Sequence, residues 1–290
     1  MIELRNIELS DKKWIEELFA YSNFRGCEYS FGNNYVWQQV YEAKIARYKD
    51  FYISHSKYGY CFPAGRGDIY EVTELLREHA AAQGEAFVYS TMDKASMEKI
   101  VQLYGTRIQI TTDRDVYDYV YEYDKLASLA GKKLQPKRNH LHRFETNDYR
   151  YEPISTDNVA DCLQMLQTWH NENDAANIET KNQEVGAVTC GLTHFFELGF
   201  TGGLLRVNGQ VQAFSYGERL NSDTFVVHAE KALKRHDGVY TAMNYELVNH
   251  VCSGYAYINR EEDMGVENLR KSKMSYHPAF LVEKFTATFA

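Results

Sequence analysis

The sequence predicts an α/β (α+β) protein made of two tandem modules, each a mixed, mostly antiparallel sheet flanked by helices. Three observations lead to this prediction. A chain of 290 residues is longer than most single hydrophobic cores support. Segments with the twofold alternation of strands follow segments with helical periodicity along the whole chain. The order helix, hairpin, strand, helix, strand occurs once in each half, although the residues themselves do not repeat.

The first module is predicted to span residues 1–130. Its first helix follows Ser10, which can cap it, and carries apolar residues such as Trp14 and Leu18 on one side. An alternating segment folds as a hairpin that turns at 57–59. The remaining elements are a helix over 68–84 that ends at Gly84, a strand over 86–91, a helix over 94–105 and a strand-like segment over 107–123.

The second module is predicted to span residues 148–290, after a basic connector over 131–147. The dipeptide Asn208-Gly209 between two alternating apolar runs is typical of a hairpin with a type I′ turn. The other elements are a strand at 149–154, a helix that begins near Thr156 or Asp157, a strand at 223–233, a helix at 241–252, a strand at 255–259, a helix at 266–276 and a strand at 279–289.

Composition excludes several classes of function. A formal net charge of -8 argues against general binding to duplex DNA, which requires a basic surface. The five cysteines are scattered without a metal-ligand spacing, and His140 and His142 have no third ligand nearby, so we predict neither disulfides nor a metal site. We find no signal peptide and no apolar run that could span a bilayer, and therefore expect a cytoplasmic protein without a transmembrane segment.

The segment 228–246 is the first candidate site. A strand enters a loop that carries Arg235 and Gly238 and then opens a helix. The free N–H groups and the positive end of the helix dipole suit a phosphate or a carboxylate, although an ordinary turn explains the same pattern. Glu230 and Lys231 point to opposite faces of the strand, so one of them can face a cleft or both can form surface pairs.

The segment 259–278 is the second candidate site and the most densely charged part of the chain. On a helix, Arg270, Lys273 and His277 share a stripe that borders apolar positions. This indicates a basic wall at the edge of a cleft, or alternatively cations whose stems cover apolar surface. The acidic residues that precede the helix offer a general base if burial raises the pKa of one of them, and the sequence does not choose among them.

The connector is the third candidate site. Residues 131–144 hold five cationic side chains and no acid, and Pro136 favours the start of a helix there. Two interpretations remain: the helix docks on acidic surface of the modules, or its cations face a cleft between them opposite Arg270 and Lys273.

The stretches "KRNHLHRF" (137–144), "HAEKALKRHDGVYTAMNYE" (228–246) and "NREEDMGVENLRKSKMSYHP" (259–278) together resemble a bacterial family related to the C-terminal domain of phosphatidylglycerol lysyltransferase. That family is similar to tandem GNAT proteins, which include the Fem aminoacyltransferases. The resemblance implies two GNAT-like acyltransferase modules. In such modules a Q/R-x-x-G-x-G/A loop holds the pyrophosphate of acyl-coenzyme A. Arg235 and Gly238 match it, but Tyr240 replaces the last small residue, which favours an aminoacyl donor.

The leading hypothesis is a transferase that moves an acyl or aminoacyl group from a phosphorylated carrier, coenzyme A or tRNA, to an amine or hydroxyl acceptor, with lipid among the acceptors. No tightly bound cofactor is expected. The alternative is a non-catalytic sensor of a phosphorylated metabolite or tRNA. The residues assigned are Glu230, Glu261 or Asp263 as the base; Arg235, Gly238, Arg270, Lys273 and His277 for the carrier; and Lys137, Arg138, Asn139, His140, Asn244, Asn259, Arg260 and Tyr276 for the substrate.

Overall fold

The computed structural model describes residues 2–172 and 178–289 and confirms the predicted fold class, with two mixed sheets flanked by helices. Contacts divide the chain into two compact units that are not continuous in sequence. The first comprises Met1–Asp118, Glu262–Val266 and Leu281–Ala290, and the second comprises Tyr119–Glu261 and Glu267–Phe280. Within the described residues, no helix combines the length and the apolar character needed to cross a bilayer.

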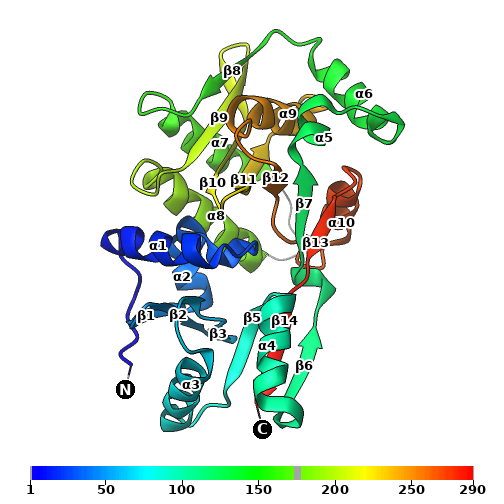
Figure 1. Cartoon of the computed structure of the whole chain (residues 1–290). Helices are drawn as coiled ribbons and strands as arrows, with labels where there is room; N and C mark the ends of the chain where they lie inside the picture. The colour runs from blue at the N-terminus through cyan, green and yellow to red at the C-terminus, as the bar shows by residue number, and fades with distance from the viewer. Residues whose placement is uncertain (1, 173–177, 290) are drawn as a thin grey trace. The chain divides into compact units, whose positions relative to one another are not determined.

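The first unit holds a seven-stranded sheet whose labelled strands follow the order β1-β2-β3-β5-β14-β6 (Figure 1). The remaining strand, β4, pairs with β2. Its strands are β1 (Lys44–Tyr48), β2 (Phe51–Ser56), β3 (Gly59–Cys61), β4 (Ala64–Gly65), β5 (Val88–Met92), β6 (Ile108–Thr112) and β14 (Phe285–Phe289). Its helices are α1 (Lys12–Ser22), α2 (Phe31–Tyr41), α3 (Ile69–Gln83) and α4 (Lys94–Tyr104).

The core of the first unit forms between its sheet and the apolar faces of α3 and α4. Val72 and Leu76 of α3 pack with Ile53 and Tyr89 of the sheet, and all four are fully buried. The end of α3 follows the prediction, and its start is capped by a side chain. The Asp68 side chain accepts the N–H of Tyr70 at the start, and Gly84 adopts a left-handed conformation at the end.

The second sheet has the order β13-β7-β12-β11-β10-β9-β8. Its strands are β7 (Asp118–Glu122), β8 (Tyr149–Pro153), β9 (Thr201–Val207), β10 (Gln210–Arg219), β11 (Thr224–Ala232), β12 (Tyr257–Asn259) and β13 (Phe280–Val282). The helices of the second unit are α5 (Tyr123–Ser128), α6 (Gln135–Phe144), α7 (Val159–Glu172), α8 (Ile178–Thr193), α9 (Val239–Val251) and α10 (Glu267–Met274).

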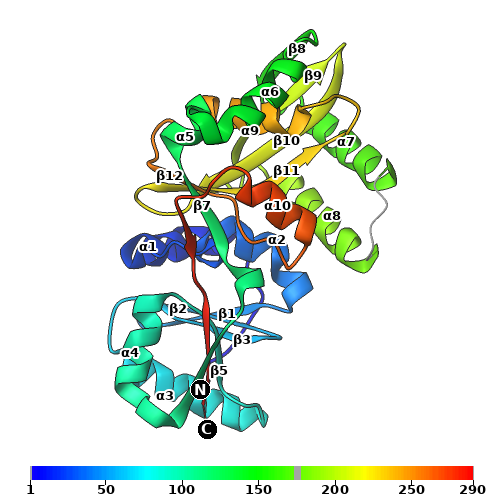
Figure 2. The same ribbon diagram turned by 90° about the vertical axis from the view of Figure 1, so that its right-hand side faces the viewer.

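Helices cover both faces of the second sheet. Figure 2 shows α9 with α5 and α6 on one face, and α7 with α8 on the other. The central strands β9, β10 and β11 are accordingly buried over nearly their whole length, as expected for a sheet that is covered on both sides.

A tight turn and a bulge shape the strands β9 to β11. Asn208 and Gly209 have φ of 49° and 77°, which confirms the predicted type I′ turn. The register of β10 and β11 shifts at Tyr216 and Gly217, so that His228 is the extra residue of a bulge. A side chain at Gly217 would place its Cβ 1.8 Å from the carbonyl oxygen of Val226. Glycine at position 217 therefore allows β10 and β11 to approach each other closely at the bulge that contains His228.

Several sequence-based boundaries need correction. The predicted strand over 107–123 is two strands in different sheets, β6 and β7, because the Asp113 side chain accepts the N–H of Asp115 and starts a 3₁₀ turn between them. The predicted strand over 279–289 is likewise divided into β13 and β14, and β14 joins the first sheet.

The basic connector folds within the second unit as a 3₁₀ turn (Lys132–Leu134) followed by α6 (Gln135–Phe144), with Pro136 in its first turn as predicted. Ser10 does not cap α1: its hydroxyl donates to Glu8, and the helix begins at Lys12. The predicted module boundaries at residues 130 and 148 stay predictions.

The close approach at Gly217 predicts a specific sensitivity. We expect Gly217→Ala to lower the free energy of unfolding by about 1–3 kcal/mol, because the backbone of β11 must move away from the added methyl group. Gly254→Ala is the matched control, since no atom lies within 4 Å of a Cβ built there. Urea denaturation of both variants measures the difference, and equal stabilities would contradict the account of the bulge.

Candidate functional site

The strands β11 and β12 run in parallel and then separate. They pair over three residue pairs, from Thr224 with Tyr257 to Val226 with Asn259. There β12 ends, while β11 continues to Ala232. We call the region beyond the last pair the splay, and define it by His228 and Glu230 of β11 and by Arg260 and Glu261, which follow β12. It brings four ionisable side chains into the interior of the second unit.

Arg260 and Glu230 form an ion pair across the splay. The Arg260 Nη2 lies 3.1 Å from each carboxylate oxygen of Glu230, and the two side chains are 10% and 13% exposed. Asn244 of α9 donates its amide to the same carboxylate at 3.4 Å. Burial alone would lower the pKa of Arg260, but the Glu230 carboxylate outweighs it and holds this pKa above its ordinary value. Arg260 therefore remains a cation.

Two polar atoms beside this ion pair are unsatisfied. Among the described residues, the buried Arg260 Nη1 and Asn244 Oδ1 have no hydrogen-bond partner. Folded proteins rarely leave such atoms unpaired, because each costs the free energy of its lost hydration. One of the two atoms can donate and the other can accept a hydrogen bond. They therefore suit a ligand that presents an acceptor and a donor close together.

Lys137 and Arg260 both lie over the ring of Tyr276. The Lys137 Nζ is 3.9 Å from the ring centre, and the guanidinium carbon of Arg260 is 4.8 Å from it. Burial, and then the positive charge of Arg260, lower the pKa of Lys137 to about 8. Lys137 can therefore release and regain a proton near neutral pH, as a general base must.

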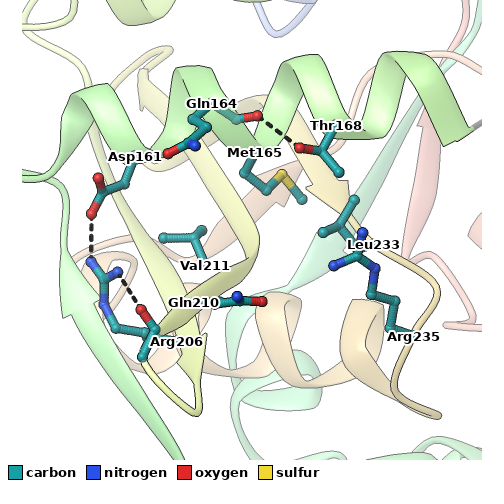
Figure 3. Close-up of a pocket in the computed structure, with 10 residues that line it drawn as sticks. Asp161, Gln164, Met165, Thr168, Arg206, Gln210, Val211, Leu233 and Arg235 are labelled. Carbon is teal, nitrogen blue, oxygen red and sulfur yellow. Dashed lines mark hydrogen bonds and ion pairs between the residues drawn. The ribbon is translucent and has the colours of Figure 1, made fainter.

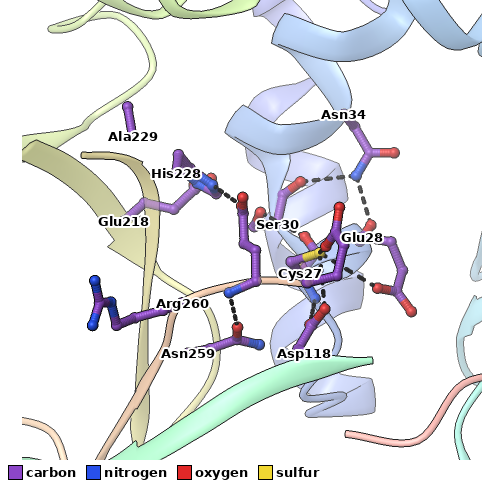
Figure 4. A network of polar contacts seen from close by, with 12 residues as sticks. Cys27, Glu28, Ser30, Asn34, Asp118, Glu218, His228, Ala229, Asn259 and Arg260 are labelled. Carbon is purple, nitrogen blue, oxygen red and sulfur yellow. Dashed lines mark hydrogen bonds and ion pairs between the residues drawn. The ribbon is translucent and has the colours of Figure 1, made fainter. Parts of the chain in front are cut away.

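His228 is held between two carboxylates (Figure 4). Its Nδ1 lies 2.8 Å from Glu261 and its Nε2 lies 2.8 Å from Glu218 of β10. Burial lowers the pKa of His228, but the two hydrogen-bonded carboxylates outweigh burial and raise the pKa to about 9. The imidazolium thus links β10, β11 and the chain after β12. Asn259 accepts the N–H of Glu261 at 2.7 Å and fixes the position of that residue.

The predicted basic stripe on α10 is not uniform. Lys273 is buried, and its Nζ donates to the carbonyl oxygens of Arg260 and Glu261 at 2.5 and 3.1 Å. Arg270 is half-buried, and His277 is exposed with a left-handed φ of 54°. Lys273 thereby supports the backbone of the splay. The predicted binding of the carrier by Arg270, Lys273 and His277 stays a prediction.

The loop before α9 is covered by α6. A Cβ at Gly238 would lie 2.0 Å from the carbonyl oxygen of His140, so α6 lies directly against the start of α9. Asp237 pairs with Arg143, whereas Arg235 turns away and pairs with Glu172 of α7. Binding of phosphate by Arg235 and Gly238 stays a prediction.

The other predicted residues of α6 hold this segment together. Arg138 donates to the carbonyl oxygens of Leu129 and Gly131. Asn139 accepts from Gln135 at 2.8 Å, and Arg143 lies 2.8 Å from the His140 ring. Of the four substrate-binding residues predicted in α6, the structure brings Lys137 to the splay.

Asp263 belongs to the first unit and stabilises a turn. Its Oδ1 accepts the N–H of Gly265 at 2.9 Å, and its Oδ2 lies 3.5 Å from Arg114. Its fully buried carboxylate is thus engaged by a backbone N–H and a cation. A role as the base stays a prediction.

A buried charge cluster in the first unit escaped the sequence analysis. The Lys284 Nζ lies 2.7 Å from Asp118 and 2.8 Å from Glu28. The Cys27 N–H donates to Asp118 at 2.7 Å (Figure 4). Cys27, Asp118 and Glu262 each offer one possible metal-ligand atom, and these three atoms lie within 4.8 Å of one another. Lys284 already supplies a cation to this cluster, and burial by itself would lower its pKa, but the surrounding anions, Asp118 first, keep it well raised.

Sequence reasoning also missed His228 and Glu218. One signal was present in the sequence. His228 and Glu230 are two residues apart on a predicted strand, so both lie on the same face of it, and ionisable side chains among apolar neighbours indicate a role other than packing. Glu218 had no such signal, because its contact with His228 depends on the register of β10 and β11.

The raised pKa of His228 predicts a pH-dependent stability. Because the folded pKa of about 9 exceeds the ordinary value of 6.5, the imidazolium stabilises the fold fully below pH 6.5 and loses this effect as the pH rises through about 9. We expect His228→Gln to be less stable than the wild type in acid and the difference to shrink in alkali. Urea denaturation across this range measures it, and a constant difference would refute the prediction.

Removal of the cation from the cluster in the first unit should be costly. Lys284→Met leaves the carboxylates of Asp118 and Glu28 buried without their cation, which we expect to lower the free energy of unfolding by about 3–5 kcal/mol. The exposed Lys99 of α4 gives the control variant Lys99→Met. Denaturation curves that coincide for the two variants would show that the cluster does not depend on Lys284.

Comparisons with known proteins concern the family and the fold of the chain. The sequence model of the family described as phosphatidylglycerol lysyltransferase, C-terminal, matches residues 19–288. A crystal structure of a conserved protein of unknown function from Bacteroides thetaiotaomicron is 38% identical, with each chain covered completely and a TM-score of 0.96. The chain spans about half the length of the curated relative that it matches.

Two more distant structures show the fold alone. L-PGS from Bacillus licheniformis is 13% identical, with 95% of this chain and 90% of that chain covered and a TM-score of 0.68. An acetyltransferase of the GNAT family from Colwellia psychrerythraea is 10% identical, with complete coverage of both chains and a TM-score of 0.56. The predicted GNAT-like architecture is thereby confirmed. The chain belongs to the family of phosphatidylglycerol lysyltransferase C-terminal domains.

Proposed function

We propose that the chain is an aminoacyltransferase that works at the splay of the second unit. The observation that carries the proposal is the pair of unsatisfied atoms, Arg260 Nη1 and Asn244 Oδ1, on either side of the Glu230 carboxylate. A carbonyl oxygen can accept from Arg260, and an amino group can donate to Asn244 and Glu230. An aminoacyl group carries both functions on adjacent carbons, whereas a simple acyl group lacks the amine.

The chemistry follows from these positions. The acceptor amine or hydroxyl attacks the carbonyl carbon, and the negative charge that develops on the carbonyl oxygen is stabilised by the guanidinium of Arg260. Lys137 in its neutral form takes the proton of the acceptor, which its lowered pKa allows. The carrier leaves when the carbonyl re-forms, and its oxygen or sulfur takes up a proton.

The donor and acceptor classes follow from chemistry and from the family. Close packing of α6 on Gly238 leaves little access to the loop that holds pyrophosphate in coenzyme A enzymes, so aminoacyl-tRNA is the first donor to test and acyl-coenzyme A the second. The family description names phosphatidylglycerol, so this lipid is the first hydroxyl acceptor to test. Simple amines are the second.

The direct test incubates the purified chain with a charged tRNA pool and anionic lipid vesicles, and detects aminoacylated lipid by mass spectrometry. We expect product with aminoacyl-tRNA and, in the same assay, a decline of about 10²-fold or more for Lys137→Met. Lys133→Met, an exposed lysine of the same basic segment, is the control. Binding of carriers without turnover on any acceptor would instead favour a sensor.

The pH profile tests the role of Lys137. We expect the wild-type rate to rise with pH through about 8, because the neutral amine is the active form. Lys137→Met should lose this dependence. A wild-type profile that is flat around pH 8 would exclude Lys137 as the base.

A change at Glu230 tests the preference for an amine. Glu230→Gln removes the negative charge that would hold the ammonium, so we expect a larger loss with aminoacyl donors than with the same donors acetylated on nitrogen. Circular dichroism and melting temperature report whether the variant folds. Equal losses for both donors would contradict an ammonium site at Glu230.

A further inference from the structure

The second unit has a cavity of about 360 Å³ on the face of its sheet covered by α7, whereas Asn244 reaches the splay from α9 on the other face. Residues of α7, of the turn between β9 and β10, and of the chain after β11 line it (Figure 3). Its volume is within the range of small-molecule sites. The proposed transfer uses none of its residues.

The floor of the cavity is apolar. Met165 of α7, Val211 of β10 and Leu233 are 3%, 8% and 3% exposed, and all three line the cavity. Figure 3 shows Met165 and Val211 near its middle and Leu233 toward one end. Such a floor suits a flat ring or an alkyl chain, and a sugar would lose hydration of its hydroxyl groups against it.

Polar groups gather around one half of the floor. The side-chain amides of Gln164 and Gln210 line the cavity and make no hydrogen bond to any of the described residues. Asp161 accepts one bond from Arg206 through Oδ2 at 2.8 Å. Arg206 also donates to both carboxylate oxygens of Glu152 and to the Gly209 carbonyl oxygen, so its charge is already paired and it forms a wall of the cavity. Two amides and a carboxylate can read a ring edge that carries an exocyclic amino group.

The opposite end of the cavity carries a cation. Figure 3 places Arg235 at the end away from Asp161 and Arg206. Arg235 pairs with the half-exposed Glu172, a surface ion pair that is worth little and can exchange for a ligand. The cavity thus presents, in order along its length, groups that read a polar ring edge, an apolar floor and a guanidinium.

We propose that this cavity binds a nucleotide whose base carries an exocyclic amino group, with the base between Gln164 and Gln210 and the phosphate at Arg235. An alkyl chain with an acidic head would satisfy the floor and Arg235 but would bury both amides without partners. The nucleotide can be free in solution or can be a residue of an RNA, since both present the same base and phosphate.

Isothermal titration calorimetry of the full chain tests the proposal. We expect adenosine or cytidine monophosphate to bind about tenfold more tightly than uridine monophosphate, because one hydrogen-bonded base contact is lost. Adenosine without phosphate and ribose 5-phosphate without base should both bind more weakly than the nucleotide. A short single-stranded RNA with a terminal adenosine, compared with the free nucleotide, distinguishes the two sources by which of them binds more tightly.

Variants locate the binding in the cavity. We expect Gln210→Leu and Arg235→Gln each to weaken nucleotide binding about tenfold, whereas the controls Gln167→Leu on α7 and Lys234→Gln beside Arg235 should not change it. Arg235→Gln should leave the binding of adenosine unaltered. Absence of binding, equal binding of ribose 5-phosphate and nucleotide, or variants that bind as the wild type would each overturn the proposal.

The two proposals can fail separately. Calorimetry detects binding without any transfer, so nucleotide binding without turnover would contradict the proposed transferase and support the cavity site. Turnover without measurable nucleotide binding would do the reverse.

Discussion

The separation of β11 from β12 places opposite charges between two strands, and the architecture of the second unit depends on how these charges are paired. Beyond Val226 and Asn259 the backbone groups of the two strands no longer bond to one another. Arg260 with Glu230, and Glu261 with His228, connect the strands there through side chains. A buried charge is tolerated when it is paired and hydrogen-bonded, and both pairs meet that condition.

The two pairs differ in a way that matters for function. Each ring nitrogen of His228 is hydrogen-bonded to a carboxylate, so this side chain has no further bond to offer a ligand and serves to hold the strands together. Arg260 retains an unsatisfied nitrogen and lies beside Asn244, which retains an unsatisfied oxygen. The hydrogen bonds of the His228 ring are thus complete, whereas those of Arg260 and Asn244 are not. At Arg260 and Asn244 a ligand can gain hydrogen bonds that the protein alone does not form.

Elements fixed by neighbouring residues could be predicted from the sequence. Asn208-Gly209 forms the predicted turn, Gly84 ends α3, and Pro136 lies in the first turn of α6, because each depends on local backbone preferences. The alternation of side chains along a strand correctly separated Glu230 from Lys231, which instead pairs with Glu184 of α8.

Features that depend on distant pairing could not be predicted. The meeting of Arg260 with Glu230 requires the parallel register of β11 and β12, and Glu218 reaches His228 through a bulge that no local pattern reveals. β14 joins the first sheet although it ends the chain. The lowered pKa of Lys137 likewise results from burial and from Arg260, which is remote in sequence.

The most direct test of the central claim is a crystal structure with a stable analogue of the donor terminus, an adenosine that carries an aminoacyl group through a 3′-amide. We expect its carbonyl oxygen to lie within hydrogen-bond distance of Arg260 Nη1 and its amino group to lie within hydrogen-bond distance of Asn244 Oδ1. A structure in which no copy of the analogue occupies the splay, with both atoms still unpaired, would contradict the assignment of the splay as the site of transfer.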